Sequence, residues 1–425
     1  MFCAKKLSKE KLPLVILHIG TVKTGTTTIQ EFIHQNRSGL ALQNLITVEG
    51  FGKKNNHDFV SFFEKAIGSW ARRRRIRTQE QKEEYFSSFE SRFLREITLR
   101  EKRIARERGA VLITSEHFSA DLRTREELES IKDFLGKYFH SIKVIGYFRP
   151  QVEMAVSLYS EKLKGQGIVP LERHLANCNP DNWLFNFHKI AKLWSSVFGK
   201  QNLHLRIFAR TKMIKGDIRH DFLDALSAVG CPINLDSLSF DQKPANESLF
   251  RLQGSVFRAI NEVVPYWPID PRSGVNPDNQ RLKKAIMPVS GLSIERFFAE
   301  DPESIQNRFI ESNRLFLDEF LPGQEFVLEQ KQDEKDSISL DSAEQMVYEL
   351  TKILLSEKVN TGRPILEDLD ADNLRDISIR ILDQKQLEAR DAVKLLELAT
   401  RARPEGPLIQ KLLKRAMAES VQKER

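Results

Sequence analysis

The amino-acid sequence predicts an α/β fold: a doubly wound parallel sheet with helices on both faces, followed by a C-terminal α-helical extension. Four short runs are apolar and rich in branched or aromatic residues, as in strands buried on both faces; they span residues 14–19, 111–114, 143–148 and 203–208. Amphipathic, helix-like segments separate them. This alternation favours a parallel sheet whose ligands bind at the carboxyl ends of its strands.

The first strand leads into the stretch VILHIGTVKTGTTTIQEFI, residues 15–33. Gly20 and Gly25 have the spacing of a phosphate-binding P-loop, G-x-x-x-x-G-K-[ST], so the predicted fold is P-loop-like. Thr26 stands where that motif has its lysine, and Lys23 lies inside the loop instead. We expect an anion to bind at the start of the following helix, where N–H groups and hydroxyls come from Thr24, Gly25, Thr26, Thr27 and Thr28.

The displaced lysine bears on the chemistry of the loop. Two features needed for triphosphate hydrolysis are missing from the sequence: Thr26 replaces the lysine, and no acidic Mg²⁺ partner is evident after a later strand. Lys23 is instead placed to stabilise charge on a departing phosphate, as in sulfuryl transfer, which requires no metal.

Composition describes a globular protein: the chain has 425 residues, of which 40% are hydrophobic and 29% charged. The net charge of +7 favours an anionic ligand or substrate. Cys3, Cys178 and Cys231 are too scattered to predict disulfides or a zinc site. The first apolar run is too short for a signal peptide or a membrane span, so we expect a cytoplasmic protein without a transmembrane segment.

An arginine run, Arg72 to Arg75, begins a segment in which acidic residues follow the basic ones closely. Two interpretations fit: a long solvated helix with i,i+4 ion pairs, or the edge of a groove for an acidic polymer. Nucleic acid is not expected, because no aromatic-interleaved basic motif or zinc-finger spacing accompanies the run.

The composition of the sequence changes near Glu329, where a charged, linker-like stretch begins. We expect an α/β domain over residues 1–330 and a helical extension over 331–425. The extension weakly resembles a tetratricopeptide helix pair, with apolar residues at helical spacing: Ala389, Ala392, Leu395, Leu396 and Ala399. One such pair cannot bury its own apolar face, so we expect it to dock a protein partner or to self-associate.

The loop and a second motif resemble the sulfotransferases that use 3'-phosphoadenylyl sulfate (PAPS), especially bacterial members that act on carbohydrates. HIGTVKTGTTTIQ is similar to their 5'-phosphosulfate loop, and VIGYFRPQVEMAVSLYSEKLK is similar to their 3'-phosphate segment, in which Arg149 and Ser157 match the binding residues. Weaker matches extend the resemblance over about the first 320 residues. It implies PAPS as cofactor, adenosine 3',5'-bisphosphate as product, no metal, and a glycan or glycolipid acceptor.

The resemblance also implies a glutamate or a histidine as general base. Glu116 and His117 adjoin at a strand end, where we expect only one of them to face the crevice. Glu116 is favoured because the matched segment contains it, although the ordinary pKa of His117 lies closer to neutrality. His57 resembles a family histidine near the acceptor, but a structural hydrogen bond beside Asp58 is equally expected. Glu49 is a third candidate base, since some distant sulfotransferases place a glutamate after their second strand.

Other interpretations stay open at this point. Asn246 and Ser248 either bind the nucleotide or cap the following helix, and the cap is favoured. A P-loop nucleotide kinase or NTPase is disfavoured by Thr26. A non-catalytic scaffold is disfavoured by Lys23, Arg149 and Ser157.

Overall fold

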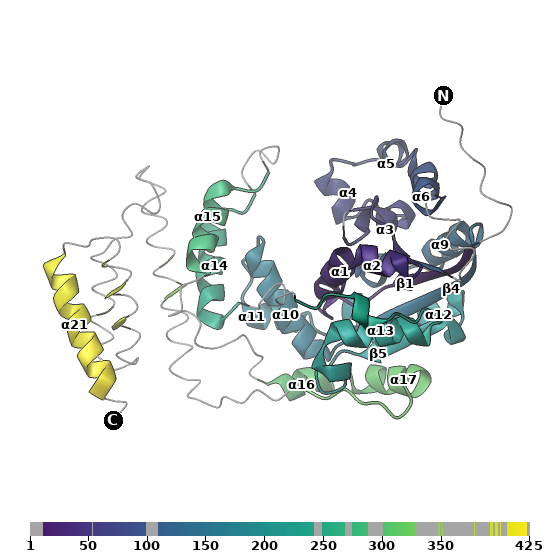
Figure 1. The fold of residues 1–425 in the computed structure, drawn as a ribbon. Coiled ribbons are helices and arrows are strands. Elements are labelled where there is room, and N and C mark those ends of the chain that lie inside the picture. Colours follow the sequence, from purple (N-terminus) through teal and green to yellow (C-terminus); the bar gives the residue numbers. More distant parts are fainter. Residues whose placement is uncertain are drawn as a thin grey trace. The chain divides into compact units, whose positions relative to one another are not determined.

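The computed structural model describes residues 12–52, 54–98, 109–241, 249–267, 274–287, 301–328 and 406–422, with scattered positions between 347 and 400. The chain divides into two compact units (Figure 1). The first comprises Met1–Ala155, Leu175–Glu247 and Glu300–Glu329, and the second comprises Val156–His174, Ser248–Ala299 and Gln330–Arg425. The last passage from the first unit to the second lies between Glu329 and Gln330, and the second unit also includes two earlier segments.

A five-stranded parallel sheet in the order β2-β3-β1-β4-β5 forms the centre of the first unit. In the register, Leu17 lies between Ile113 of one neighbouring strand and Val144 of the other. The α/β architecture with a parallel sheet is therefore confirmed. The strands are β1 (Leu12–His18), β2 (Leu45–Thr47), β3 (Ala110–Thr114), β4 (Phe139–Phe148) and β5 (Leu203–Ile207).

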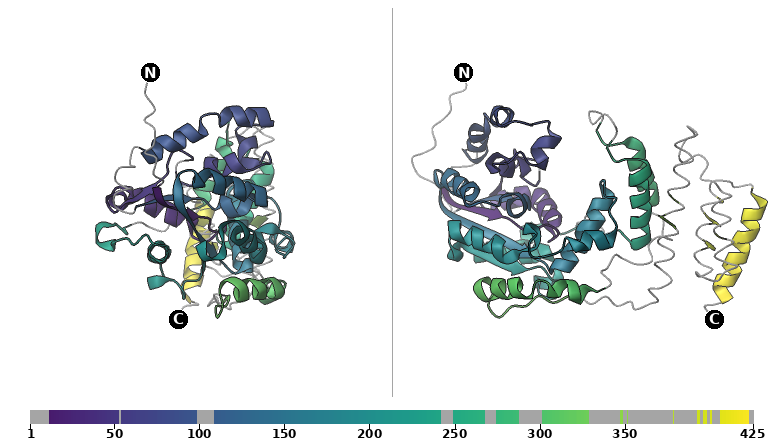
Figure 2. Two further views of the ribbon diagram at one scale, coloured as in Figure 1. Left: turned by 90° about the vertical axis from the view of Figure 1, so that its right-hand side faces the viewer. Right: turned by 180° about the vertical axis from the view of Figure 1, so that it is seen from behind.

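Helices cover both faces of this sheet (Figure 2). On one face, Ile16 and Tyr147 share a buried cluster with Phe32 of α1 (Thr26–Gln35) and Phe222 of α13 (Ile218–Ala228). Side chains alternate between faces along a strand, so Phe148 points opposite to Tyr147. Its ring packs against Phe187 of α12 (Phe187–Phe198), which covers the second face together with α9 (Arg125–Gly136). This two-sided burial explains why the central strands β1 and β3 are apolar along most of their length, whereas the edge strand β5 includes His204 and Arg206.

The arginine-rich segment does not form one long helix. Its described residues, up to Thr98, form three short helices: α4 (Ser69–Arg73), α5 (Gln79–Tyr85) and α6 (Phe89–Thr98). The long-helix prediction is wrong because Arg75 adopts a left-handed conformation, with φ of 63°, just after α4. The i,i+4 charge spacing is local and does not register such a break.

Several shorter helices complete the first unit: α2 (Arg37–Leu42), α3 (His57–Phe63), α8 (His117–Asp121), α16 (Pro302–Asn307) and α17 (Ile310–Phe320). Two further helices, α10 (Gln151–Lys164) and α11 (Leu171–Ala176), contribute residues to both units. None of the helices described is both long and apolar enough to span a bilayer.

The second unit is helical in the residues described. Leu163 of α10 packs with Phe257 of α14 (Arg251–Val263), and Ile260 packs with Leu282 of α15 (Pro277–Ile286). Its last helix is α21 (Pro407–Gln422). Of the expected C-terminal apolar residues, Ala392 and Leu396 are helical and buried. The linker-like stretch and Ala389, Leu395 and Ala399 lie outside the described residues.

Candidate functional site

The loop between β1 and α1 turns sharply through two left-handed residues. Lys23 and Gly25 both adopt left-handed conformations, with φ of 66° and 73°. Thr21 and Thr24 are buried, and their hydroxyls donate hydrogen bonds to the carbonyls of Tyr147 (2.9 Å) and Thr21 (2.6 Å). These two hydroxyls therefore stabilise the loop. Because the hydroxyl of Thr24 already donates to a carbonyl, its predicted ligand contact is left to its backbone N–H.

The start of α1 presents unbonded backbone donors. The first helical hydrogen bond runs from the N–H of Ile29 to the carbonyl of Gly25, at 3.0 Å. The N–H groups of Thr26, Thr27 and Thr28 precede it and so have no carbonyl partner within the helix. Gly25 supplies no side-chain cap, and the first turn of α1 contains no acidic residue. The positive end of the helix dipole is thus not neutralised by the helix itself, which favours an anion there.

Both loop glycines are in positions that a side chain would disturb. A Cβ on Gly20 would lie 2.8 Å from Cγ2 of Thr26, so the two ends of the loop are in contact. A Cβ on Gly25 would lie 3.0 Å from the ring of Phe208, just after β5. The same ring has the guanidinium of Arg149 over it, 5.5 Å from its centroid. Phe208 therefore links the loop to the predicted 3'-phosphate residue.

Arg149 follows β4, the neighbour of β1. The chain leaves β1 toward β2 on one side and leaves β4 toward β5 on the other, so their carboxyl ends form the switch point at which open α/β sheets bind ligands. Nε of Arg149 donates to Oε2 of Glu153 at 3.0 Å. Ser157 lies on α10 among the residues of the second unit. The convergence of Ser157 and Arg149 on one phosphate stays a prediction. Asn246 and Ser248, for which we expected nucleotide binding or helix capping, lie outside the described residues.

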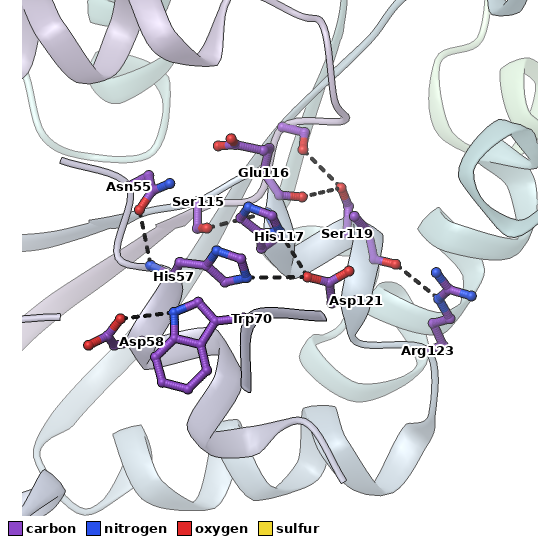
Figure 3. A network of polar contacts seen from close by, with 12 residues as sticks. Asn55, His57, Asp58, Trp70, Ser115, Glu116, His117, Ser119, Asp121 and Arg123 are labelled. Atoms are coloured by element: carbon purple, nitrogen blue, oxygen red, sulfur yellow. Dashed lines mark hydrogen bonds and ion pairs between the residues drawn. The ribbon is translucent and has the colours of Figure 1, made fainter. Parts of the chain in front are cut away.

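Glu116 and His117 diverge, although for another reason than strand alternation. The strand ends at Thr114, Glu116 precedes α8, and His117 is the first residue of that helix. Oε2 of Glu116 accepts a hydrogen bond from Nε2 of Gln30 on α1, at 2.9 Å. His117 turns to Asp121 instead (Figure 3). Glu116 is thereby tied to the helix that the loop begins.

His57, His117 and Asp121 form a compact cluster (Figure 3). Nδ1 of His117 lies 2.8 Å from Oδ2 of Asp121, and Nε2 of His57 lies 3.6 Å from the same oxygen. The two imidazoles are stacked, with centroids 3.3 Å apart. Burial lowers the pKa of His57. Burial alone would raise the pKa of Asp121, but polar contacts from both histidines outweigh it and hold that pKa well below its usual range. At neutral pH the cluster therefore contains a carboxylate beside a neutral His57.

Asp121 was not among the residues that the sequence singled out. Its signal was the i,i+4 spacing from His117, which places both side chains on one helical face. The expected partner of His57, Asp58, is occupied elsewhere: it accepts hydrogen bonds from Nε1 of Trp70 (3.1 Å) and from Arg74 (3.3 Å). Trp70 and Arg74 thus hold Asp58, and His57 turns to Asp121.

Charged residues of the neighbouring helices border the cluster. Burial, reinforced by the negative charge of Asp121, raises the pKa of Glu64 to about 7. The positive charge of Arg73 contributes to lowering the pKa of His57, so the arginine run begins within electrostatic range of the cluster.

Glu49 is bound by Nη1 of Arg37, which contacts both of its carboxylate oxygens, at 3.1 and 2.9 Å. This ion pair engages both of the oxygens with which Glu49 would act as a base.

His18 directly precedes the loop between β1 and α1. It ends β1, is fully buried, and places Nδ1 2.8 Å from Oγ1 of Thr114 on β3. Its ring packs against Phe222 at a centroid distance of 5.0 Å. Burial lowers the pKa of His18 to about 3, so this imidazole is neutral in the folded protein at ordinary pH.

The chain was compared with known proteins in three ways. No family model, no curated protein and no solved structure matched it significantly.

Gly25→Ala should destabilise the protein by more than Gly216→Ala. Both glycines have a positive φ, 73° and 65°, and an alanine pays roughly 1–2 kcal/mol in such a conformation. Only Gly25 also faces a packed ring, because the atom nearest to a Cβ on Gly216 is 3.8 Å away. Urea unfolding measures both losses. Equal losses would show that the contact with Phe208 contributes nothing.

His18→Gln should flatten the acid limb of the stability profile. The folded state holds His18 neutral, whereas the unfolded chain gains a proton below pH 6.5, so stability is present above that pH and lost as the pH falls toward 3. The loss approaches about 1.4 kcal/mol for each pH unit. Urea unfolding of wild type and variant at pH 7 and pH 5 tests this. An unchanged difference between the two pH values would contradict it.

Proposed function

We propose that the protein is a PAPS-dependent sulfotransferase with a P-loop-like fold, which transfers a sulfuryl group to a hydroxyl or amine of a glycan or glycolipid. The observation that carries the proposal is the loop after β1. Its left-handed Lys23 and Gly25 lead into a helix start with unbonded N–H groups and no acidic residue, at the carboxyl edge of the parallel sheet. This is a site for the 5'-phosphosulfate of the cofactor.

The reaction is an in-line displacement at sulfur. The acceptor oxygen or nitrogen forms a bond to sulfur while the bond from sulfur to the bridging oxygen of the 5'-phosphate breaks. Negative charge grows on the departing adenosine 3',5'-bisphosphate, and the ammonium of Lys23 stabilises it. The acceptor's proton passes to a general base. This scheme assigns no step to a metal ion.

Glu116 is the base that we favour. Its carboxylate follows β3, the other neighbour of β1, and Gln30 binds one of its oxygens from the helix that the loop begins. The hydrogen bond from Gln30 orients the carboxylate relative to the bound cofactor. His117 is the alternative, because its contact with Asp121 through Nδ1 leaves Nε2 as the proton acceptor if Nδ1 carries the proton.

Arg149 supports the assignment of the cofactor as a nucleotide with phosphates at both ends of its ribose. Its guanidinium follows the strand next to β1 and packs over the ring that contacts Gly25. A forked donor there suits the 3'-phosphate. The arginine run near His57 suits an acceptor that carries acidic groups of its own.

Adenosine 3',5'-bisphosphate should stabilise the protein more than ATP with Mg²⁺ does, and a chelator should not alter the effect. A ligand at about 100 times its Kd adds about 2.7 kcal/mol to the free energy of unfolding, which a thermal shift detects. A larger shift with ATP and Mg²⁺ would favour a kinase or NTPase. As a matched control, Arg149→Ala should weaken the bisphosphate but hardly affect adenosine 5'-phosphosulfate, which has no 3'-phosphate. Equal weakening of both would make Arg149 structural.

Lys23→Ala and Glu116→Gln should both reduce turnover far more than cofactor affinity, because both residues act on charge or protons that move in the transition state. Glu116→Gln should cost roughly 10²- to 10⁴-fold in rate. His117→Asn should cost much less. Single-turnover rates with an identified acceptor compare the three. Loss of transfer in His117→Asn with activity kept in Glu116→Gln would move the base to His117.

A further inference from the structure

We propose that His57, His117 and Asp121 bind a divalent transition-metal ion of the zinc type. This site goes beyond the proposed sulfotransferase activity, whose mechanism does not use a metal. It also departs from the sequence-based expectation of no metal, because Asp121 was not recognised as a third ligand.

The separations of the three ligand atoms suit one ion. One ligand atom from each residue lies within 4.8 Å of the other two. Oδ2 of Asp121 is 2.8 Å from Nδ1 of His117 and 3.6 Å from Nε2 of His57. Zinc binds imidazole nitrogen and carboxylate oxygen at about 2.0–2.2 Å, so two ligands at a tetrahedral angle stand about 3.3–3.6 Å apart. The separation of 3.6 Å falls within this range, and the separation of 2.8 Å lies below it, so the side chains of His117 and Asp121 must move apart slightly to share an ion.

A second observation is the state of the His57 side chain. It is only 7% exposed, and its buried Nε2 has no hydrogen-bond partner in the structure although it faces Asp121. A buried polar atom without a partner is unfavourable, because it has lost its hydrogen bonds to water without replacement. Nε2 of His57 and Oδ2 of Asp121 face each other at 3.6 Å. A cation between them satisfies both atoms at once.

The three candidate ligands lie on helices, and hydrogen bonds hold the backbone of both histidines. His57 and His117 are the first residues of α3 and α8, and Asp121 lies one turn along α8 from His117. Oδ1 of Asn55 accepts the N–H of His57, and Oγ of Ser115 accepts the N–H of His117, each at 3.3 Å. The rings are stacked with planes 12° apart, so ligation requires one ring to turn about χ2 until both lone pairs point at the ion.

The donor set selects the class of metal. Two imidazoles and one carboxylate suit Zn²⁺ and similar ions, whereas Mg²⁺ and Ca²⁺ prefer oxygen ligands alone. Three protein ligands leave a position for water or a ligand group, as in zinc sites with open coordination. The nearby carboxyl of Glu64 favours a cation, and the charge of Arg73 opposes it.

Metal binding can be measured without cofactor or acceptor, so the result is independent of the proposed activity. The full chain without a polyhistidine tag is stripped with a chelator and titrated with Co²⁺. We expect one equivalent to bind with the visible absorption of a low-coordinate Co²⁺ site, Zn²⁺ to displace it, and Zn²⁺ to raise Tm. His57→Ala, His117→Ala and Asp121→Asn should weaken binding by more than about 100-fold, since even groups that only orient ligands cost roughly 10- to 100-fold.

His188→Ala is the matched control, because His188 also pairs with a carboxylate, Glu319, at 2.9 Å, but lies outside the cluster. It should keep the Co²⁺ spectrum. Absence of that spectrum in the wild type, or its persistence in the three ligand variants, would overturn the proposal. Far-UV circular dichroism checks that each variant folds. If one does not, the wild-type titration and the remaining variants decide.

Discussion

The pairing of Thr21 with Tyr147 fixes the geometry on which the rest of the site depends. The N–H and the hydroxyl of Thr21 both bond the carbonyl of Tyr147, at 3.1 and 2.9 Å, beyond the end of β1. The ladder between β1 and β4 is thereby extended into the loop. On the other side, the N–H of Ser115 bonds the carbonyl of His18 at 3.0 Å, which ties the end of β3 to the same point. Lys23, Arg149 and Glu116 thus follow three strand ends that are bonded to one another.

Burial determines which of the polar groups in this region keep a chemical role. The hydroxyls of Thr21 and Thr24 are bound to carbonyls, and His18 is held neutral. The helix start, in contrast, retains donors that no residue of α1 satisfies. A loop with a rigid interior and unpaired outward donors is suited to bind an anion without reorganising.

Much of the fold could be predicted from the sequence, because strands and helices produce apolar patterns that are local in the sequence. The central strands β1 and β3 are mostly apolar, and the Gly20 to Gly25 spacing predicted a strand, a tight loop and a helix in that order. The break at Arg75 was not predictable, since its conformation depends on its surroundings. For the candidate site, the sequence indicated single residues but not their partners. Glu116 and His117 were found as neighbours, but their partners Gln30 and Asp121 were not, because a hydrogen bond from Gln30 to Glu116 joins residues 86 apart in the sequence.

Phe208 has a consequence for which molecules the site admits. Its ring lies against Gly25 and within reach of the guanidinium of Arg149, so a single aromatic ring adjoins both the loop and the guanidinium. Under the proposed function, this shared ring favours ligands whose two charged ends are separated by a matching distance, before any contact with a base or a sugar is made.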